Sequence, residues 1–158
     1  MAQEAVAPEE LARWTRRFAV ECNNRAWRLA EAPGRTAEED EEMLHSAHAA
    51  ALHWGQVGTE LHRARATMLL AHVHGLLGHG ESAMEYATRS FAYVASHDSP
   101  PWEVAFAHAV LANAASAAGK RDLHGKHYAI AKALGASLPD EEERAIFEAT
   151  FRAVPVPP

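Results

Sequence analysis

The stretch LAHVHGLLG at residues 70–78 decides the fold, because LANAASAAG at residues 111–119 repeats its pattern. Each stretch opens with a Leu-Ala pair and closes on a glycine, and the two glycines are 41 positions apart. A Tyr-Ala pair follows each glycine, at residues 86–87 and again at residues 128–129. A period of this length is typical of helical hairpins that stack on one another. Small residues let paired helices approach closely, and glycine permits the tight turn between them.

The rest of the chain continues this helical pattern. No segment alternates apolar and polar residues over the length of a strand, whereas apolar residues recur at helical spacing throughout. We therefore predict a single all-α domain over residues 1–158, with about seven antiparallel helices and short connections. The predicted hairpins cover residues 8–54, 59–97 and 101–134, and a C-terminal capping helix covers residues 140–152.

Two of these helices carry specific local signals. Thr36 and Glu39 have the spacing of a capping box, which predicts that the second helix begins directly after Thr36. Five residues of the first helix share one face at helical spacing and are expected to form its buried stripe: Leu11, Trp14, Phe18, Cys22 and Leu29.

The repeated stretches resemble the tetratricopeptide repeat, whose pattern places small residues in both helices and glycine at the turn. The first copy matches at Ala71, Gly78, Ala83 and Ala87, and the second copy matches at Ala112, Gly119 and Ala131. His124 and Tyr128 stand where the pattern expects small residues, and the period exceeds the usual length of about 34 residues. The resemblance covers the C-terminal two-thirds of the chain, and we describe the expected fold as tetratricopeptide-like.

A second resemblance concerns residues 38–59, which include His45, His48, His53, Trp54 and Thr59. This segment is similar to a part of uncharacterised bacterial tetratricopeptide-like proteins. The similarity implies a bacterial source and brings no activity with it.

Charge and composition limit the classes of partner. The net charge of -6 disfavours nucleic acid and anionic membrane surfaces, which both attract basic proteins. No apolar run approaches the roughly 20 residues of a membrane-spanning helix. The single cysteine, Cys22, favours a reducing compartment, and the acidic segment 1–10 lacks the features of a signal peptide. We expect a cytoplasmic protein.

The eleven histidines raise the question of a metal site. Glu41, His45 and His48 follow one another at i, i+4 and i+7, which places them within roughly 60° on one helix face. A carboxylate and two imidazoles can hold a divalent transition metal if a neighbouring helix adds a ligand. The alternative is that these histidines line a solvated helix face. No other cofactor is expected.

The sequence contains no nucleophile elbow, phosphate-binding loop or helical zinc-protease motif, so it favours a protein without catalytic activity. Stacked hairpins form a groove that can take a peptide, and tetratricopeptide-like proteins use first-helix residues for this purpose. Asn23, Asn24 and Trp27 are the candidate groove residues, since amides can bond to a peptide backbone. The leading hypothesis is a scaffold that binds a protein or peptide. The alternatives are a metal or small-molecule site on the histidine-rich second helix, with or without catalysis, and a structural protein that forms a homodimer.

Overall fold

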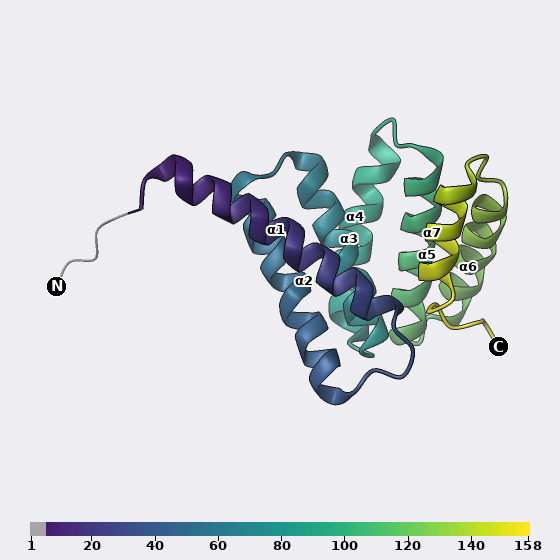
Figure 1. Cartoon of the computed structure of the whole chain (residues 1–158). Coiled ribbons are helices and arrows are strands. Elements are labelled where there is room, and N and C mark those ends of the chain that lie inside the picture. Colours follow the sequence, from purple (N-terminus) through teal and green to yellow (C-terminus); the bar gives the residue numbers. More distant parts are fainter. Residues whose placement is uncertain (1–5) are drawn as a thin grey trace.

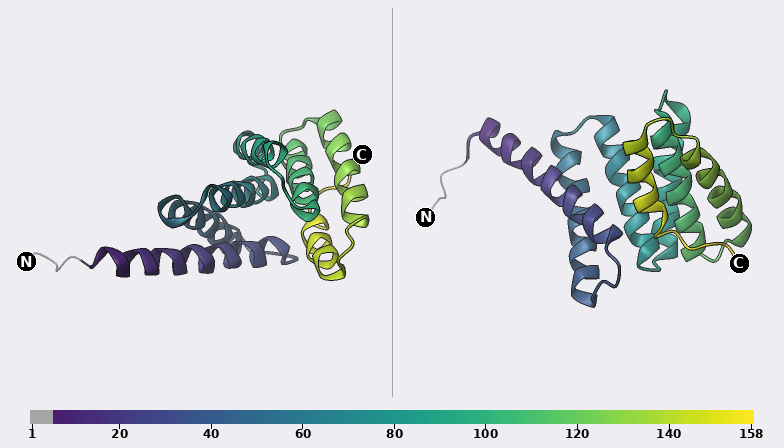
Figure 2. Two further views of the ribbon diagram at one scale, coloured as in Figure 1. Left: turned by 90° about the horizontal axis from the view of Figure 1, so that it is seen from above. Right: turned by 45° about the vertical axis from the view of Figure 1, so that its right-hand side comes forward.

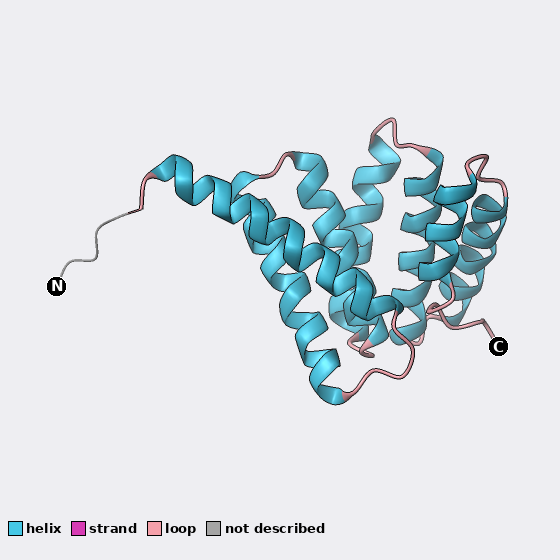
Figure 3. Ribbon diagram, viewed as in Figure 1, coloured by secondary structure: helices cyan, strands magenta, loops and turns pink. Residues whose placement is uncertain are grey.

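The computed structural model describes residues 6–158, and its regular secondary structure within that range is entirely α-helical (Figure 3). The first five residues, which belong to the segment considered for a signal peptide, lie outside the described part. Seven helices follow one another along the chain (Figure 1): α1 (Pro8–Glu31), α2 (Ala37–Val57), α3 (Glu60–Leu76), α4 (Gly80–Ser96), α5 (Pro101–Ala117), α6 (Arg121–Ala136) and α7 (Glu141–Phe151). The predicted all-α fold and its seven helices are confirmed.

Side-chain caps explain where two of the helices begin. The Thr36 hydroxyl accepts a bond from the Glu39 amide at 3.2 Å, and the Thr36 amide donates to the Glu39 carboxylate at 2.9 Å. This reciprocal pair is the predicted capping box of α2. Thr59 and His62 form the same arrangement at the start of α3, with the His62 ring nitrogen in place of a carboxylate oxygen. The sequence analysis did not predict that second box.

The two glycines of the repeated stretches end α3 and α5 in the same way. Gly78 and Gly119 have φ values of +75° and +69°, in the left-handed region that favours glycine. The residue after each glycine donates its amide to a carbonyl five positions earlier: His79 to His74 at 2.9 Å, and Lys120 to Ala115 at 2.8 Å. Both turns therefore have the Schellman arrangement, and the repeat predicted from the sequence is a repeat of local structure.

The helices pack chiefly in sequential pairs, α1 with α2, α3 with α4 and α5 with α6. Helix α5 also packs against α3, α4 and α7, and most of its residues are buried, as expected for a helix that is apolar on all sides. Alanines of the repeated stretches lie at these crossings and are at most 1% exposed: Ala71, Ala83, Ala87, Ala112 and Ala131. Helix α7 lies against α5, α6 and the end of α1.

The prediction for the buried face of α1 was wrong for three of its five residues, whereas Cys22 and Leu29 are partly buried and pack against buried core residues. Leu11, Trp14 and Phe18 are 57%, 43% and 50% exposed, and the buried face consists of Thr15, Ala19, Ala26 and Ala30. At about 100° per residue the two faces lie roughly 95° apart, so α1 has a small-residue face toward α2 and a second, apolar face outside it.

The position of α2 explains why the beginning of this second face, at Leu11 and Trp14, is exposed, whereas the Phe18 ring lies beside His53 of α2, with ring centroids 6.0 Å apart. The Arg16 guanidinium donates to the carbonyl of Val57, the last residue of α2, at 3.1 Å. Helix α2 therefore ends beside Arg16, and the first two turns of α1 extend past it. Figure 2 shows the N-terminal half of α1 projecting beyond the other helices. None of the helices in residues 6–158 has the length and apolarity that a membrane span requires.

Candidate binding pocket

A mostly apolar pocket of about 290 Å³ opens between α1, α3, α5 and α7. The first helix of each hairpin thus contributes to one cavity, and α7 closes one side of it. Ten residues line it: Asn23, Trp27, Glu31, Arg65, Met68, Trp102, Glu103, Phe106, Ile146 and Thr150. We call this cavity the aromatic pocket.

Three aromatic side chains set its shape. The Trp27 ring meets Phe106 edge-on, with centroids 6.1 Å apart, and Trp102 meets the same phenylalanine edge-on at 5.9 Å. Trp27 also stacks on the fully buried His72 ring at 5.6 Å. Edge-to-face and stacked contacts at these distances are favourable, and they fix the rings that form the walls.

An ion pair with a buried carboxylate lies in the wall of the pocket formed by α3 and α5. The Arg65 Nε donates to a carboxylate oxygen of Glu103 at 2.7 Å, and the Glu103 side chain is only 3% exposed. The Arg65 side chain is 42% exposed, and its guanidinium lies over the Trp102 ring at 5.1 Å. The pair satisfies the buried carboxylate and leaves part of the guanidinium facing the pocket.

The structure divides the predicted groove residues. Asn23 and Trp27 both line the aromatic pocket. Asn24 is exposed on the neighbouring face of α1 and does not line the pocket, although its side-chain oxygen accepts a long bond from Asn23 at 3.4 Å. The buried Thr150 hydroxyl of α7 donates to Glu31 at 3.2 Å, which joins the C-terminal helix to the end of α1.

Sequence reasoning could not identify the rest of the lining. Arg65 and Glu103 are 38 residues apart in the chain, and only the packing of α3 on α5 brings them together. For Trp102, its place after two prolines at the start of a helix was the available signal in the sequence.

The structure does not bring the three predicted metal ligands together. Glu41 and His45 border an open surface hollow beside Cys22 and Arg25, between α1 and α2. His48 points elsewhere, and its Nε2 lies 3.2 Å from the Nε2 of His74 on α3. Within residues 6–158, no three His, Cys, Asp or Glu side chains are grouped so that they could hold a metal ion. The physical reason is that seven residues span two helical turns, and α2 is covered by different helices along that length.

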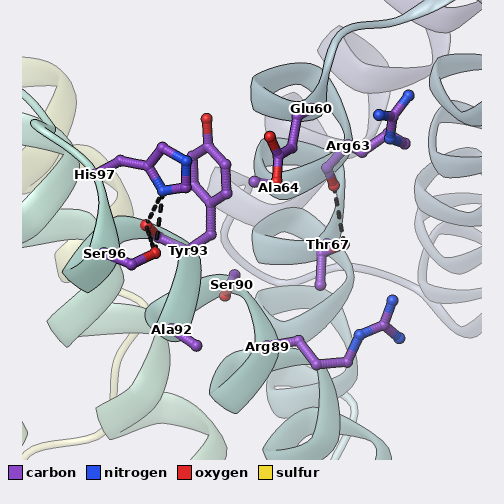
Figure 4. A pocket seen from close by; sticks show the side chains of 10 residues that line it. All are labelled: Glu60, Arg63, Ala64, Thr67, Arg89, Ser90, Ala92, Tyr93, Ser96 and His97. Carbon is purple, nitrogen blue, oxygen red and sulfur yellow. Dashed lines mark hydrogen bonds between the residues drawn. The ribbon is translucent and has the colours of Figure 1, made fainter.

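A second, polar pocket lies between α3 and α4 and is shown in Figure 4. Its basic groups do not converge, because the guanidinium groups of Arg63 and Arg89 point away from His97 (Figure 4). His97 stacks on Tyr93 at 3.9 Å, and its Nδ1 lies 2.8 Å from the Tyr93 carbonyl oxygen. This arrangement gives no focused site for an anion.

The comparisons with known proteins identify no relative. No family model, no curated protein and no solved structure matches the chain. The chemistry of the pocket therefore has to be read from its own residues. Its lining offers apolar rings, one paired guanidinium, the buried carboxylate of Glu103, the exposed carboxylate of Glu31 and two neutral polar groups. This set suits the binding of an apolar group beside a hydrogen-bond acceptor that faces the guanidinium.

Proposed function

We propose that this protein is a non-catalytic, tetratricopeptide-like scaffold that binds a segment of another protein in the aromatic pocket. The observation that carries the proposal is the convergence of Trp27, Trp102 and Phe106, from the first helices of the first and third hairpins, on one cavity. Concave surfaces built from the first helices of stacked hairpins are the usual binding surfaces of such proteins.

The size of the pocket favours a side chain over a larger ligand. A volume of about 290 Å³ is at the lower limit for small-molecule sites, which extend to roughly 1,000 Å³. It suits one large apolar side chain, and the aromatic walls resemble the pockets that receive anchor residues at protein interfaces. The exposed part of Arg65 can donate to a main-chain carbonyl or a carboxylate next to that anchor.

Peptide selection tests the proposal directly. Random peptides displayed on phage are selected on the wild-type protein, and the affinities of the selected peptides are then measured by fluorescence anisotropy. We expect the peptides to share an aromatic or aliphatic anchor. Ile146→Lys places a charge at the mouth of the pocket without disturbing the core, because Ile146 is 53% exposed. This variant and Trp27→Ala are expected to weaken binding at least tenfold.

The matched control is Asn24→Ala, on the same helix and outside the pocket. It is expected to bind the selected peptides as the wild type does. Equal affinity of all four proteins for the peptides would reject the pocket as the binding site.

Self-association is a second candidate function, and one observation favours it. Within residues 6–158, eight large apolar side chains are exposed, and five of them lie in residues 6–20. Clusters of this kind on a soluble domain mark interaction surfaces. We infer that the face of α1 formed by Leu11, Trp14 and Phe18, which we call the α1 face, pairs with a second copy of the chain.

A further inference from the structure

Three histidines from different parts of the sequence form an unbroken series of ring contacts. The Nε2 atoms of His48 on α2 and His74 on α3 are 3.2 Å apart. The other ring nitrogen of His74, Nδ1, lies 3.1 Å from Nδ1 of His79, in the turn before α4. Each ring nitrogen of His74 therefore contacts another histidine, and His74 is the middle residue of the three.

The surroundings hold the His74 ring in place. Tyr86 of α4 stacks against it, with ring centroids 5.6 Å apart and planes inclined by 23°. His74 is 8% exposed, whereas His48 and His79 are exposed to solvent. The protein thus holds the His74 ring in place, while the His48 side of the pair is open to solvent.

The spacing of the two Nε2 atoms matches that of a metal chelate. Zinc–nitrogen bonds are about 2.0–2.1 Å long, so two nitrogens in a tetrahedral site lie roughly 3.3 Å apart. The imidazole planes of His48 and His74 are inclined by 81°, which keeps the rings clear of each other around a shared ion. We propose that His48 and His74 bind a divalent transition-metal ion through their Nε2 atoms, with water in the remaining positions.

This pair differs from the set predicted from the sequence. His48 belongs to both, but its partner is His74 of the next helix and not Glu41 or His45 of its own helix. A tetrahedral ion held by two protein nitrogens keeps two positions for water, one more than the single open position of a catalytic zinc site. An all-imidazole donor set suits Cu²⁺, Ni²⁺ and Zn²⁺ over Mg²⁺ or Ca²⁺, which prefer oxygen.

The protonation state and the outer contacts support this assignment. Burial, with His48 and His79 adding to it, lowers the pKa of His74 to about 4, and burial with the nearby His45 lowers the pKa of His48. Burial thus favours the neutral form of both imidazoles, which is the form that binds metals. When Nε2 of His74 holds a metal, its Nδ1–H can donate to Nδ1 of His79, which is the outer hydrogen bond that orients most metal-bound histidines.

A second histidine pair provides an internal comparison. His108 and His127 approach through their Nδ1 atoms at 2.8 Å, which is shorter than the spacing in a tetrahedral chelate. Burial lowers the pKa of both rings, His127 adds to the effect on His108, and the Lys126 cation adds to the effect on both. A neighbouring cation opposes a metal ion, so we expect no binding at this second pair.

Zinc calorimetry on chelator-treated, untagged full-length protein is the main test. We expect one Zn²⁺ per chain, and at least tenfold weaker binding by His48→Ala and by His74→Gln. His79→Ala is expected to weaken binding about tenfold, as outer hydrogen-bond partners usually do. His45→Ala, Glu41→Gln and His127→Gln are expected to bind as the wild type does. Because His48 is exposed, His48→Ala tests the site even if His74→Gln disturbs folding.

Electron paramagnetic resonance of the Cu²⁺-loaded protein supplies an independent readout. Coupling to two imidazole nitrogens in the wild type, and to one in His48→Ala, is the expected result. The proposal is overturned if the wild type binds no Zn²⁺, or if the copper spectrum shows fewer than two imidazoles. It is also overturned if His45→Ala or Glu41→Gln abolishes binding while His74→Gln retains it, since that result assigns the metal to the α2 residues alone.

Discussion

His72 and Asn113 occupy equivalent positions in the two repeated stretches, 41 residues apart, and they are hydrogen-bonded to each other. The Asn113 amide nitrogen donates to the His72 carbonyl at 3.0 Å and lies 3.2 Å from the His72 Nδ1. Both residues are at most 1% exposed. Gly75 makes room for the amide, because a Cβ at this position would lie 2.6 Å from the Asn113 nitrogen. The two hairpins are therefore joined through the same position of each copy.

Removal of this amide is expected to destabilise the protein. Asn113→Ala leaves the buried His72 carbonyl without its donor, and an unsatisfied buried polar group costs about 1–3 kcal/mol. Urea denaturation should show a loss of that size in the free energy of unfolding. Asn24→Ala, at an exposed asparagine, is the control and should change stability by less than about 0.5 kcal/mol. Equal stability of the two variants would mean that the bond contributes nothing.

His72 also makes the stability depend on pH. Burial, with a smaller effect of Arg35, lowers the pKa of His72 to about 4, and its Nε2 is buried without a partner in the described residues. In the unfolded chain the pKa is about 6.5, so between pH 6.5 and 4 the unfolded state binds a proton that the folded state does not. The contribution of His72 to the free energy of unfolding should fall by about 1.4 kcal/mol per pH unit as the pH drops through this window, in addition to the contributions of the other histidines with lowered pKa values.

The variant His72→Gln isolates that contribution. The free energy of unfolding is measured by urea denaturation at several pH values. Between pH 6 and 4.5 it should change less steeply with pH in the variant, by an amount that corresponds to about one proton. Above pH 7 the slope of both proteins should be the same, because His72 is neutral there in both states. An unchanged slope in the acidic window would show that His72 is protonated in the folded protein.

The two partners of the Arg65–Glu103 ion pair are expected to differ in how much stability is lost when each is replaced. Arg65→Met leaves the Glu103 carboxylate buried without its partner, which should cost about 3–5 kcal/mol. Glu103→Gln should cost less, since a neutral amide oxygen still accepts from the arginine. The double variant Arg65→Met/Glu103→Leu should regain most of the loss, as measured by a double-mutant cycle in urea. Additive losses would contradict a direct pairing of the two groups.

Local features of this fold could be predicted from the sequence, and contacts between helices could not. Glycine at 78 and 119 and the pair Thr36–Glu39 act within one turn of chain, so their spacing contains the information. The buried face of α1 depends on where α2 ends, and helical spacing alone could not place it. The ion pair joins Arg65 and Glu103, which are 38 positions apart in the sequence. The contact of His48 with His74 joins residues that are 26 positions apart. A search for ligands at i+4 and i+7 examines one helix and cannot find such partners.

Gly135 is predicted to be essential for the docking of α7. A Cβ on this residue would overlap the ring of Phe147, which is 2% exposed. Gly135→Ala should therefore lower the free energy of unfolding by about 1–3 kcal/mol, the usual cost of overpacking a core. Gly125→Ala is the matched control on the same helix, because in residues 6–158 no atom outside its chain neighbours and the adjacent helix backbone lies within 4 Å of its Cβ position. The control should stabilise the protein by about 0.5–1 kcal/mol, since alanine favours helix over glycine. Thermal unfolding that ranks the two variants in the opposite order would contradict the packing of α7 on α6.

The α1 face leads to a prediction about oligomeric state. Antiparallel pairing of two α1 helices about Trp14 would bury Leu11 and Phe18 and would bring Glu10 near Arg17 of the partner subunit, a favourable pair of charges. Light scattering after size-exclusion chromatography should show a dimer, and Leu11→Ser/Phe18→Ser should be monomeric with unchanged helicity. Glu10→Arg should weaken the dimer, and the swap Glu10→Arg/Arg17→Glu should restore it. Val156→Ser, at an exposed apolar residue elsewhere, should leave the dimer intact. A wild-type monomer at all concentrations tested would exclude self-association through this face.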